Sequence, residues 1–143
     1  MTRYRRGKGT VGVRIAVAGM RFGAAFVPIY IHHPAVAHVG IVDPDTEALN
    51  AVGDKFDIVR RHRDLGEAID SDEYDAVHLV TPIPMHAEQA VRVLDSGKHC
   101  ACTVPMATSL KDLRAIVSAQ RRSRKNYMMM ETAVYTRQFL FAR

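Results

Sequence analysis

Six short apolar segments alternate with segments of helical periodicity along residues 13–130, and no other feature restricts the fold as strongly. The first segment, Val13–Ala18, is rich in β-branched residues and ends at a glycine, which is typical of a strand buried on both faces. The other strand-like segments lie at residues 38–42, 56–59, 75–80, 98–102 and 127–130. Strands that alternate with helices form a parallel sheet covered on both faces. The alternation therefore predicts a single α/β domain with a doubly wound parallel sheet.

The segments between the strands carry helix signals. Apolar spacing predicts helices over residues 21–32, 64–69 and 85–96, one that begins at residues 43–45, and one capped by Ser109. Pro28 falls inside the first of these helices and is expected to kink or shorten it. Gly97 closes the helix over residues 85–96. A further apolar segment over residues 135–141 follows the sixth strand.

Charge and cysteine content exclude several classes of protein. Four of the positive charges behind the net +5 fall in residues 1–8, so residues 1–10 are expected to form a basic, disordered leader. Such a leader can bind nucleic acid nonspecifically, but Tyr4 is its single aromatic residue, which argues against that partner. No apolar run is long enough for a membrane span, and no signal peptide is evident. Cys100 and Cys102 are too close to staple a long loop and lack further metal ligands, so a reducing cytoplasm and no metal are expected.

The loop after the first strand is the first candidate ligand site, because parallel sheets bind ligands at the carboxyl ends of their strands. Its candidate cofactor-binding residues are Gly19, Met20, Arg21, Phe22 and Gly23. Glycines here permit a tight turn and a close approach of the backbone to a pyrophosphate, and Arg21 adds a positive charge. The spacing departs from G-x-G-x-x-G, so a plain strand–helix turn is an equal alternative.

Asp43 strengthens the dinucleotide interpretation. It follows the second predicted strand, near the offset from Gly19 at which an acidic side chain binds the adenosine ribose. A carboxylate there repels a 2′-phosphate, so NAD is favoured over NADP as the cofactor. The alternative is helix capping by Asp43 or Asp45 around Pro44. The two roles are compatible if Asp45 caps the helix while Asp43 binds ribose.

Two later segments carry a family resemblance. Residues 81–86 read T-P-I-P-M-H, and residues 97–99 read G-K-H. With the glycine turn and Asp43, they resemble the nucleotide domain of the Gfo/Idh/MocA family of NAD(P)-dependent oxidoreductases, whose members carry T-P-x-x-x-H and G-K-H motifs. The resemblance implies a Rossmann-type NAD(P)-binding domain over residues 11–132. It also implies that Thr81, Pro82 and His86 line the cofactor pocket, beside the nicotinamide-side ribose and the diphosphate.

The chain departs from the family pattern after the fifth strand. The family usually reads E-K-P there, with a lysine that takes part in catalysis, whereas this chain reads T-V-P at residues 103–105. Because Val104 can neither donate a hydrogen bond nor relay a proton, no catalytic residue is assigned. Thr103 and Pro105 are counted with the cofactor-binding residues.

The resemblance also implies a C-terminal substrate domain, so residues 133–143 are expected to be the start of a truncated connection to it. The chain alone is expected to be inactive. Three functions stay open: the cofactor domain of an oxidoreductase acting on a sugar or polyol, a noncatalytic nucleotide-binding module, and a nonspecific nucleic-acid binder. Phe139, Leu140 and Phe141 are expected to form an exposed apolar patch that causes self-association or binds a partner chain.

Overall fold

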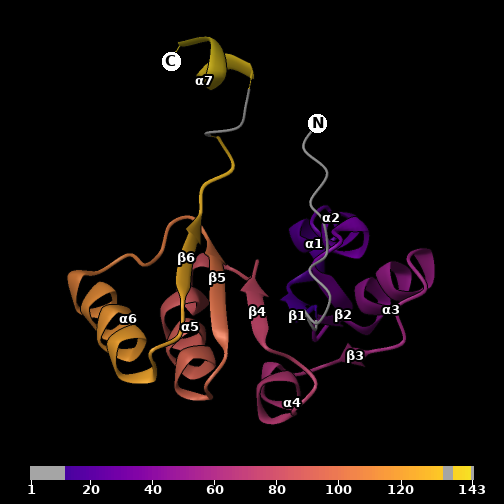
Figure 1. Cartoon of the computed structure of the whole chain (residues 1–143), viewed down its shortest axis with the longest axis horizontal. Helices are drawn as coiled ribbons and strands as arrows, with labels where there is room; N and C mark the ends of the chain where they lie inside the picture. Colours follow the sequence, from indigo (N-terminus) through magenta and orange to yellow (C-terminus); the bar gives the residue numbers. More distant parts are fainter. Residues whose placement is uncertain (1–11, 134–136, 143) are drawn as a thin grey trace.

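A six-stranded parallel sheet forms the centre of the molecule (Figure 1). The computed structural model describes residues 12–133 and 137–142. The strands are β1 (Val13–Ala18), β2 (Val36–Val42), β3 (Arg61–His62), β4 (Ala76–Leu79), β5 (His99–Thr103) and β6 (Tyr127–Met130). Their order across the sheet is β3-β2-β1-β4-β5-β6, and every neighbouring pair is parallel. The predicted doubly wound parallel sheet is confirmed, and its strand order reverses between β1 and β4.

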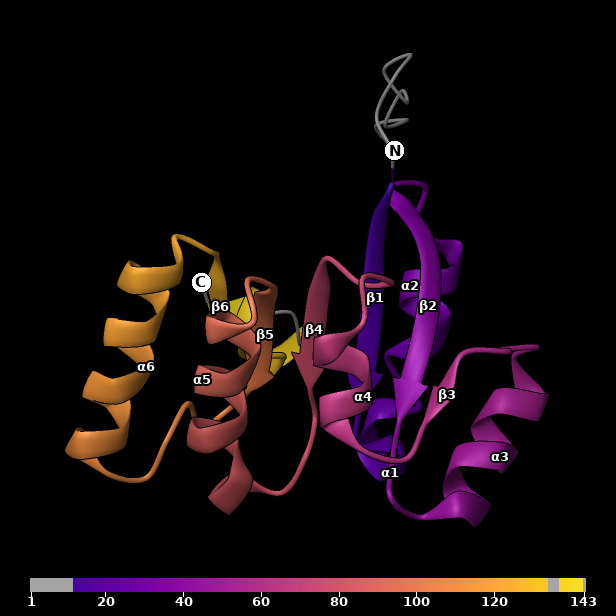
Figure 2. The same cartoon turned by 90° about the horizontal axis from the view of Figure 1, so that it is seen from below.

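Helices cover the sheet from both sides (Figure 2). They are α1 (Met20–Gly23), α2 (Val27–His32), α3 (Thr46–Lys55), α4 (Leu65–Asp70), the 3-10 helix η1 (Ile83–Met85), α5 (His86–Asp95) and α6 (Leu110–Ser123). A further helix, α7 (Arg137–Ala142), follows β6 along the chain. One apolar core joins the sheet to α4, α5 and α6, and a second joins it to α1, α2 and α3. Alternate residues of β1 serve the two cores, because Ala16 and Ala18 face the first and Val17 faces the second.

The third strand differs from its prediction. Residues 56–59 were expected to form it, but β3 contains only Arg61 and His62, which pair with the end of β2. Phe56 caps α3, and Asp57 turns the chain with a φ of 53°. The apolar run therefore serves as the exit from α3, and its member Ile58 is buried in the second core.

The predicted helix over residues 21–32 is two helices, α1 and α2. Residues 24–26 separate them, and Pro28 lies in the first turn of α2. A proline is tolerated there because the first N–H groups of a helix have no partner within it. Pro84 acts similarly within η1, directly before α5. Pro28 was expected either to kink or to shorten the helix over residues 21–32, and the structure shows a shorter helix that begins next to it.

Capping residues set the bounds of the longer helices. Asp45, Asp64 and Ser109 each accept hydrogen bonds from backbone N–H groups at the starts of α3, α4 and α6. Gly97 follows α5 with a φ of 81°, a conformation that favours glycine. The helix ends therefore lie close to where the capping signals in the sequence placed them.

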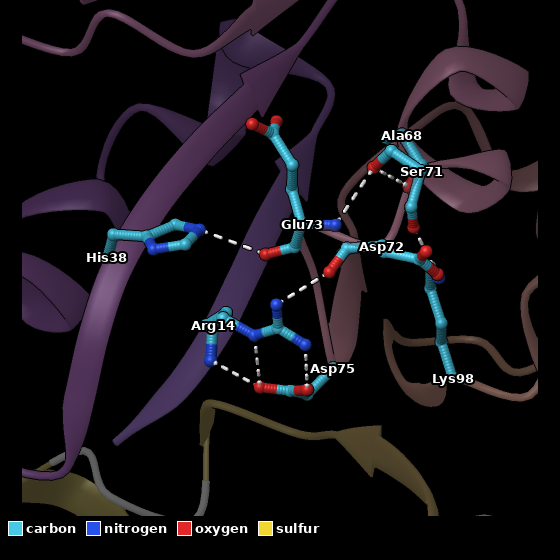
Figure 3. Close-up of polar contacts among 8 residues, drawn as sticks. All are labelled: Arg14, His38, Ala68, Ser71, Asp72, Glu73, Asp75 and Lys98. Carbon is cyan, nitrogen blue, oxygen red and sulfur yellow. Dashed lines mark hydrogen bonds and ion pairs between the residues drawn. The ribbon is translucent and has the colours of Figure 1, made fainter. Parts of the chain in front are cut away.

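A polar network fixes the amino ends of the strands, opposite the strand ends at which ligands bind (Figure 3). The Arg14 guanidinium donates to both carboxylate oxygens of Asp75, at 3.0 and 2.6 Å, and to the Asp72 carbonyl at 2.6 Å. The Lys98 ammonium donates to the Ser71 carbonyl at 2.8 Å. The hydrogen bonds from Arg14 lower the pKa of Asp75 to about 2. The network fastens the loop between α4 and β4 to β1 and to the start of β5.

The ends of the chain bear on several sequence predictions. The predicted disordered leader, residues 1–10, lies outside the described residues, as do residues 134–136 and 143 of the C-terminal segment. Figure 1 shows α7 beyond the end of β6, apart from the sheet and its helices. Within the part of the chain that the structure describes, no helix combines the length and apolar character needed to cross a membrane.

Candidate functional site

Two adjoining cavities lie at the carboxyl ends of the central strands. The first measures about 440 Å³, and the second about 380 Å³. The predicted cofactor-binding residues that line the first are Gly19, Arg21, Phe22, Asp43, Thr81 and Pro82. Those that line the second are Phe22, Thr81, Pro82, His86 and Thr103. Met20, Gly23 and Pro105 line neither cavity. Most of the predicted set is therefore brought together at the point where the strand order reverses.

The first glycine of the turn allows the loop to pass against the end of β4. Gly19 has a φ of 97°, and a Cβ atom there would lie 2.5 Å from the Val80 carbonyl oxygen. No other residue type fits this position without displacing backbone. The second glycine, Gly23, packs against Val17 and Val80 and serves the contact between α1 and β1. The two glycines thus perform the roles of tight turn and close packing.

The residues between the two glycines point in different directions. The Met20 side chain is buried in the second core, with 1% of its surface exposed. Arg21 and Phe22 are exposed, and both line the first cavity. A guanidinium at the mouth of this cavity provides positive charge for an anionic ligand.

Asp43 fastens the glycine turn to the end of β2. One carboxylate oxygen accepts the Met20 N–H at 2.6 Å, and the other accepts the Asp45 N–H at 2.9 Å. Asp45 caps α3 by accepting from the N–H groups of Glu47 and Ala48. Capping therefore belongs to Asp45, while Asp43 is buried in the cavity wall. Each oxygen of Asp43 has a second lone pair with which it can accept from a ligand hydroxyl.

Threonine and histidine side chains hold the loops after β4 and β5. The Thr81 hydroxyl donates to the Gln89 side-chain oxygen, and the Thr103 hydroxyl donates to the Leu79 carbonyl at 3.3 Å. His86 is buried, and its ring nitrogens lie 2.8 Å from the carbonyl oxygens of Thr81 and Pro105. These side chains shape the cavity walls from behind.

Gln89 is a buried polar residue beside the candidate site that the sequence reasoning missed. It is 7% exposed and provides the partner of the Thr81 hydroxyl. A signal was available, because Gln89 lies three residues after His86 on α5 and so shares its face of the helix. A polar residue on the inward face of a helix indicates a buried hydrogen bond.

The family follows from the comparison of the whole domain with known proteins. The model described as "Oxidoreductase family, NAD-binding Rossmann fold" (GFO_IDH_MocA) matches residues 13–131. The chain belongs to the Gfo/Idh/MocA family. It is an NAD-binding Rossmann domain of these oxidoreductases, as the sequence resemblance implied.

Curated relatives in the Gfo/Idh/MocA family are much longer than this chain. A 4-carboxy-2-hydroxymuconate-6-semialdehyde dehydrogenase of Sphingobium sp. (strain NBRC 103272 / SYK-6) is 34% identical over 112 residues, which cover 78% of this chain and 36% of the relative. A glycosyl hydrolase family 109 protein of Shewanella baltica (strain OS155 / ATCC BAA-1091) is 38% identical over 79 residues, covering 55% of this chain and 17% of the relative. The chain thus spans about a third or less of these relatives.

Solved structures of low identity share the fold. The WlbA dehydrogenase from Bordetella pertussis, solved with NADH and UDP-GlcNAcA, has a TM-score of 0.82 at 23% identity, over 92% of this chain and 40% of that one. A myo-inositol 2-dehydrogenase from Lactobacillus plantarum has a TM-score of 0.83 at 17% identity, with the same coverage. These likenesses establish the Rossmann architecture.

This chain carries an aliphatic side chain, Val104, at the position where the Gfo/Idh/MocA family usually has a lysine. Val104 lines the second cavity together with Met130 and Thr132. No described residue in the wall of that cavity carries a carboxylate or an amine. His86 is its one ring-nitrogen group, and both of its nitrogens face backbone carbonyls.

Two thiols and a second histidine are also buried. Cys100 and Cys102 are buried against α5 and α6, and burial raises the pKa of the Cys102 thiol to about 11. His78 is buried, but only Nδ1 has a partner, the Tyr30 hydroxyl at 3.0 Å. Burial lowers the pKa of His78 to about 4, so the ring is neutral.

Proposed function

We propose that this chain binds NAD in preference to NADP and serves as the cofactor domain of an oxidoreductase acting on a sugar or polyol. The observation that carries the proposal is the buried Asp43 carboxylate in a cavity bordered by the positive-φ Gly19. The first cavity has a volume within the range of small-molecule sites. It combines a backbone cradle for a pyrophosphate with an acidic acceptor for ribose hydroxyls.

In this proposal the dinucleotide extends across both cavities. Asp43 would accept from the adenosine ribose, and the Gly19 turn with Arg21 would hold the pyrophosphate. Thr81, Pro82 and Thr103 would form the wall beside the nicotinamide, in the second cavity. When bound, NAD accepts or supplies a hydride, and this chain's residues position it. A cytoplasmic location is part of the proposal, in keeping with two free, buried thiols.

A titration of the 143-residue protein with NADH, followed by fluorescence, tests the binding. Gly19→Ala is the critical variant, and Gly97→Ala is its matched control. Both glycines have positive φ, at 97° and 81°, so both substitutions strain the backbone. Only Gly19 borders the cavity, while nothing lies near the Cβ position of Gly97. We expect Gly19→Ala to abolish saturable binding and Gly97→Ala to retain it. The absence of saturable NADH binding by the wild-type protein would refute the proposal.

A second candidate function, a noncatalytic nucleotide-binding module, is favoured by Val104. An aliphatic side chain in the second cavity cannot exchange a proton with a substrate. We expect the 143-residue chain to bind NAD and to show no NAD-linked turnover of polyols. Val104→Lys alone should not restore turnover, because substrate positioning supplies much of the rate. NADH production from a polyol by the wild-type chain would exclude the noncatalytic function.

We also propose that α7 contacts another chain or another domain. Phe139, Leu140 and Phe141 are 46%, 58% and 95% exposed, three consecutive apolar side chains on one short helix. An exposed cluster of this kind marks an interaction surface. The partner could be a second copy of this chain or a substrate-binding domain.

A further inference from the structure

His86 joins two loops in the wall of the second cavity. It is the first residue of α5, and only 1% of its surface is exposed. Its Nε2 lies 2.8 Å from the Thr81 carbonyl oxygen in the loop after β4. Its Nδ1 lies 2.8 Å from the Pro105 carbonyl oxygen in the loop after β5. One imidazole thus spans the two loops that would form the nicotinamide wall.

The two partners determine which form of the ring satisfies both contacts. A carbonyl oxygen can only accept a hydrogen bond, so each ring nitrogen must donate. A neutral imidazole carries one N–H, and an imidazolium carries two. In the neutral form a ring lone pair would face a carbonyl lone pair at 2.8 Å with no proton between them. Only the imidazolium makes both bonds.

No side chain in the wall of the second cavity would offset the charge of an imidazolium at this position. The other side chains of the second cavity wall are uncharged. The charged groups on α1, α5, α6 and the segment after β6 are not buried; they are Arg21, Glu88, Arg92, Asp95, Lys111, Asp112, Arg114, Arg121, Arg122 and Glu131. Burial and the amino end of a helix both disfavour a cation. In an imidazolium, the two charge-assisted hydrogen bonds to carbonyls would therefore have to supply the stabilisation.

We propose that His86 is a positioning residue that ties the Thr81 loop to the Pro105 loop as an imidazolium, and that the loss of its second proton releases one loop and weakens dinucleotide binding. The proposal rests on the proposed binding of NAD in these cavities. It assigns His86 a role in holding the wall of the second cavity in place, through backbone carbonyls. His78 provides the contrast within the same chain, since it is buried with one partner and a free Nε2.

Two measurements test this role. The first uses the protein without cofactor: nitrogen-15 NMR of the imidazoles shows whether His86 carries protons on both nitrogens. The second is NADH affinity from about pH 5 to about pH 8, the range in which histidine titrates. We expect two N–H protons on His86 at the acidic end, and an affinity that falls roughly two- to tenfold toward the alkaline end, the effect of one lost hydrogen bond.

The variants separate this role from general stability. His86→Gln keeps a donor but cannot titrate, so its affinity should not change with pH. His78→Gln removes the other buried imidazole and should keep the pH dependence of the wild type. A neutral His86 across the whole range, or an unchanged pH dependence in His86→Gln, would overturn the proposal. If no NADH binds at any pH, the proposed function fails, while the NMR measurement still decides the protonation of His86.

Discussion

Replacement of Asp43 tests cofactor choice and the stability of the glycine turn together. Its carboxylate accepts the N–H groups of Met20 and Asp45, and the residue lines the first cavity. Asp43→Ala removes both acceptors and the charge. Asp43→Asn removes the charge but keeps one acceptor oxygen. The two variants therefore separate the effect of the charge on cofactor choice from the effect of the hydrogen bonds on the stability of the glycine turn.

The expected loss of stability follows from the exposure of the two N–H groups. Met20 is buried, so its N–H would be left without a partner, whereas Asp45 is exposed and water can replace the lost bond. One buried, unsatisfied donor costs about 1–3 kcal/mol in the free energy of unfolding. For a domain of this length, Asp43→Ala should lower Tm by about 3–10 °C. Asp43→Asn should lower it by less.

Thermal unfolding with and without nucleotide provides the assay. Bound ligand at ten times Kd stabilises the native state by about 1.4 kcal/mol, which is a measurable rise in Tm. In the wild type, NAD should raise Tm more than NADP at equal concentration, because the carboxylate repels the 2′-phosphate. Both Asp43 variants should narrow this difference. Asp64→Ala, which removes the cap of α4 away from the cavities, should lower Tm and leave the difference intact.

Two results would refute the reasoning about Asp43. If NADP raises the Tm of the wild type as much as NAD does, the carboxylate does not select the cofactor. If Asp43→Ala unfolds at the wild-type temperature, the hydrogen bond to Met20 contributes nothing to stability.

Three further predictions concern other parts of the molecule. Urea unfolding at a series of pH values should show stability falling in two steps. As the pH falls from 6.5 to about 4, His78 takes up a proton in the unfolded chain but not in the folded protein, and the free energy of unfolding decreases. As the pH falls further, from 3.8 to about 2, Asp75 is protonated and its ion pair with Arg14 is lost. His78→Gln should remove the first step and Asp75→Asn the second. Gly40→Ala should cost about 1–3 kcal/mol in urea unfolding, because the new Cβ would collide with the Tyr74 ring. Serine at each of residues 139–141 should reduce self-association in analytical ultracentrifugation, whereas a wild-type protein that stays monomeric at high concentration would contradict that surface.

The sequence was sufficient for five of the six strands because their signals are local. The continuous apolar run of β1 and the cap residues Asp45 and Ser109 act within a few positions of themselves. The third strand was misplaced because Phe56 and Ile58 pack in the second core without pairing in the sheet. Ile58 is buried in that core and Phe56 packs against it, in the segment that follows α3. Their apolar character reflects tertiary packing, which the sequence pattern does not distinguish from strand pairing.

The candidate site was predicted at the level of loops and only in part at the level of side chains. The motif at residues 81–86 placed His86 at the cofactor pocket, and the structure places it in the wall of the second cavity. Its two carbonyl partners lie on different loops, and no spacing in the sequence reveals them. The bond from Met20 to Asp43 likewise joins the ends of two strands, which become neighbours only when the sheet forms.

The two hydrogen bonds that Asp43 accepts would limit how this domain could change the cofactor preference proposed above. In an exchange of NAD for NADP, replacement of the acidic residue is the direct first mutation. Here that mutation also detaches the glycine turn from β2, so the intermediate would be less stable before it gained any affinity for a 2′-phosphate. A stabilising substitution elsewhere would have to come first. The Arg14–Asp75 end of the sheet, remote from the cavities, is where such a substitution could accumulate without altering nucleotide recognition.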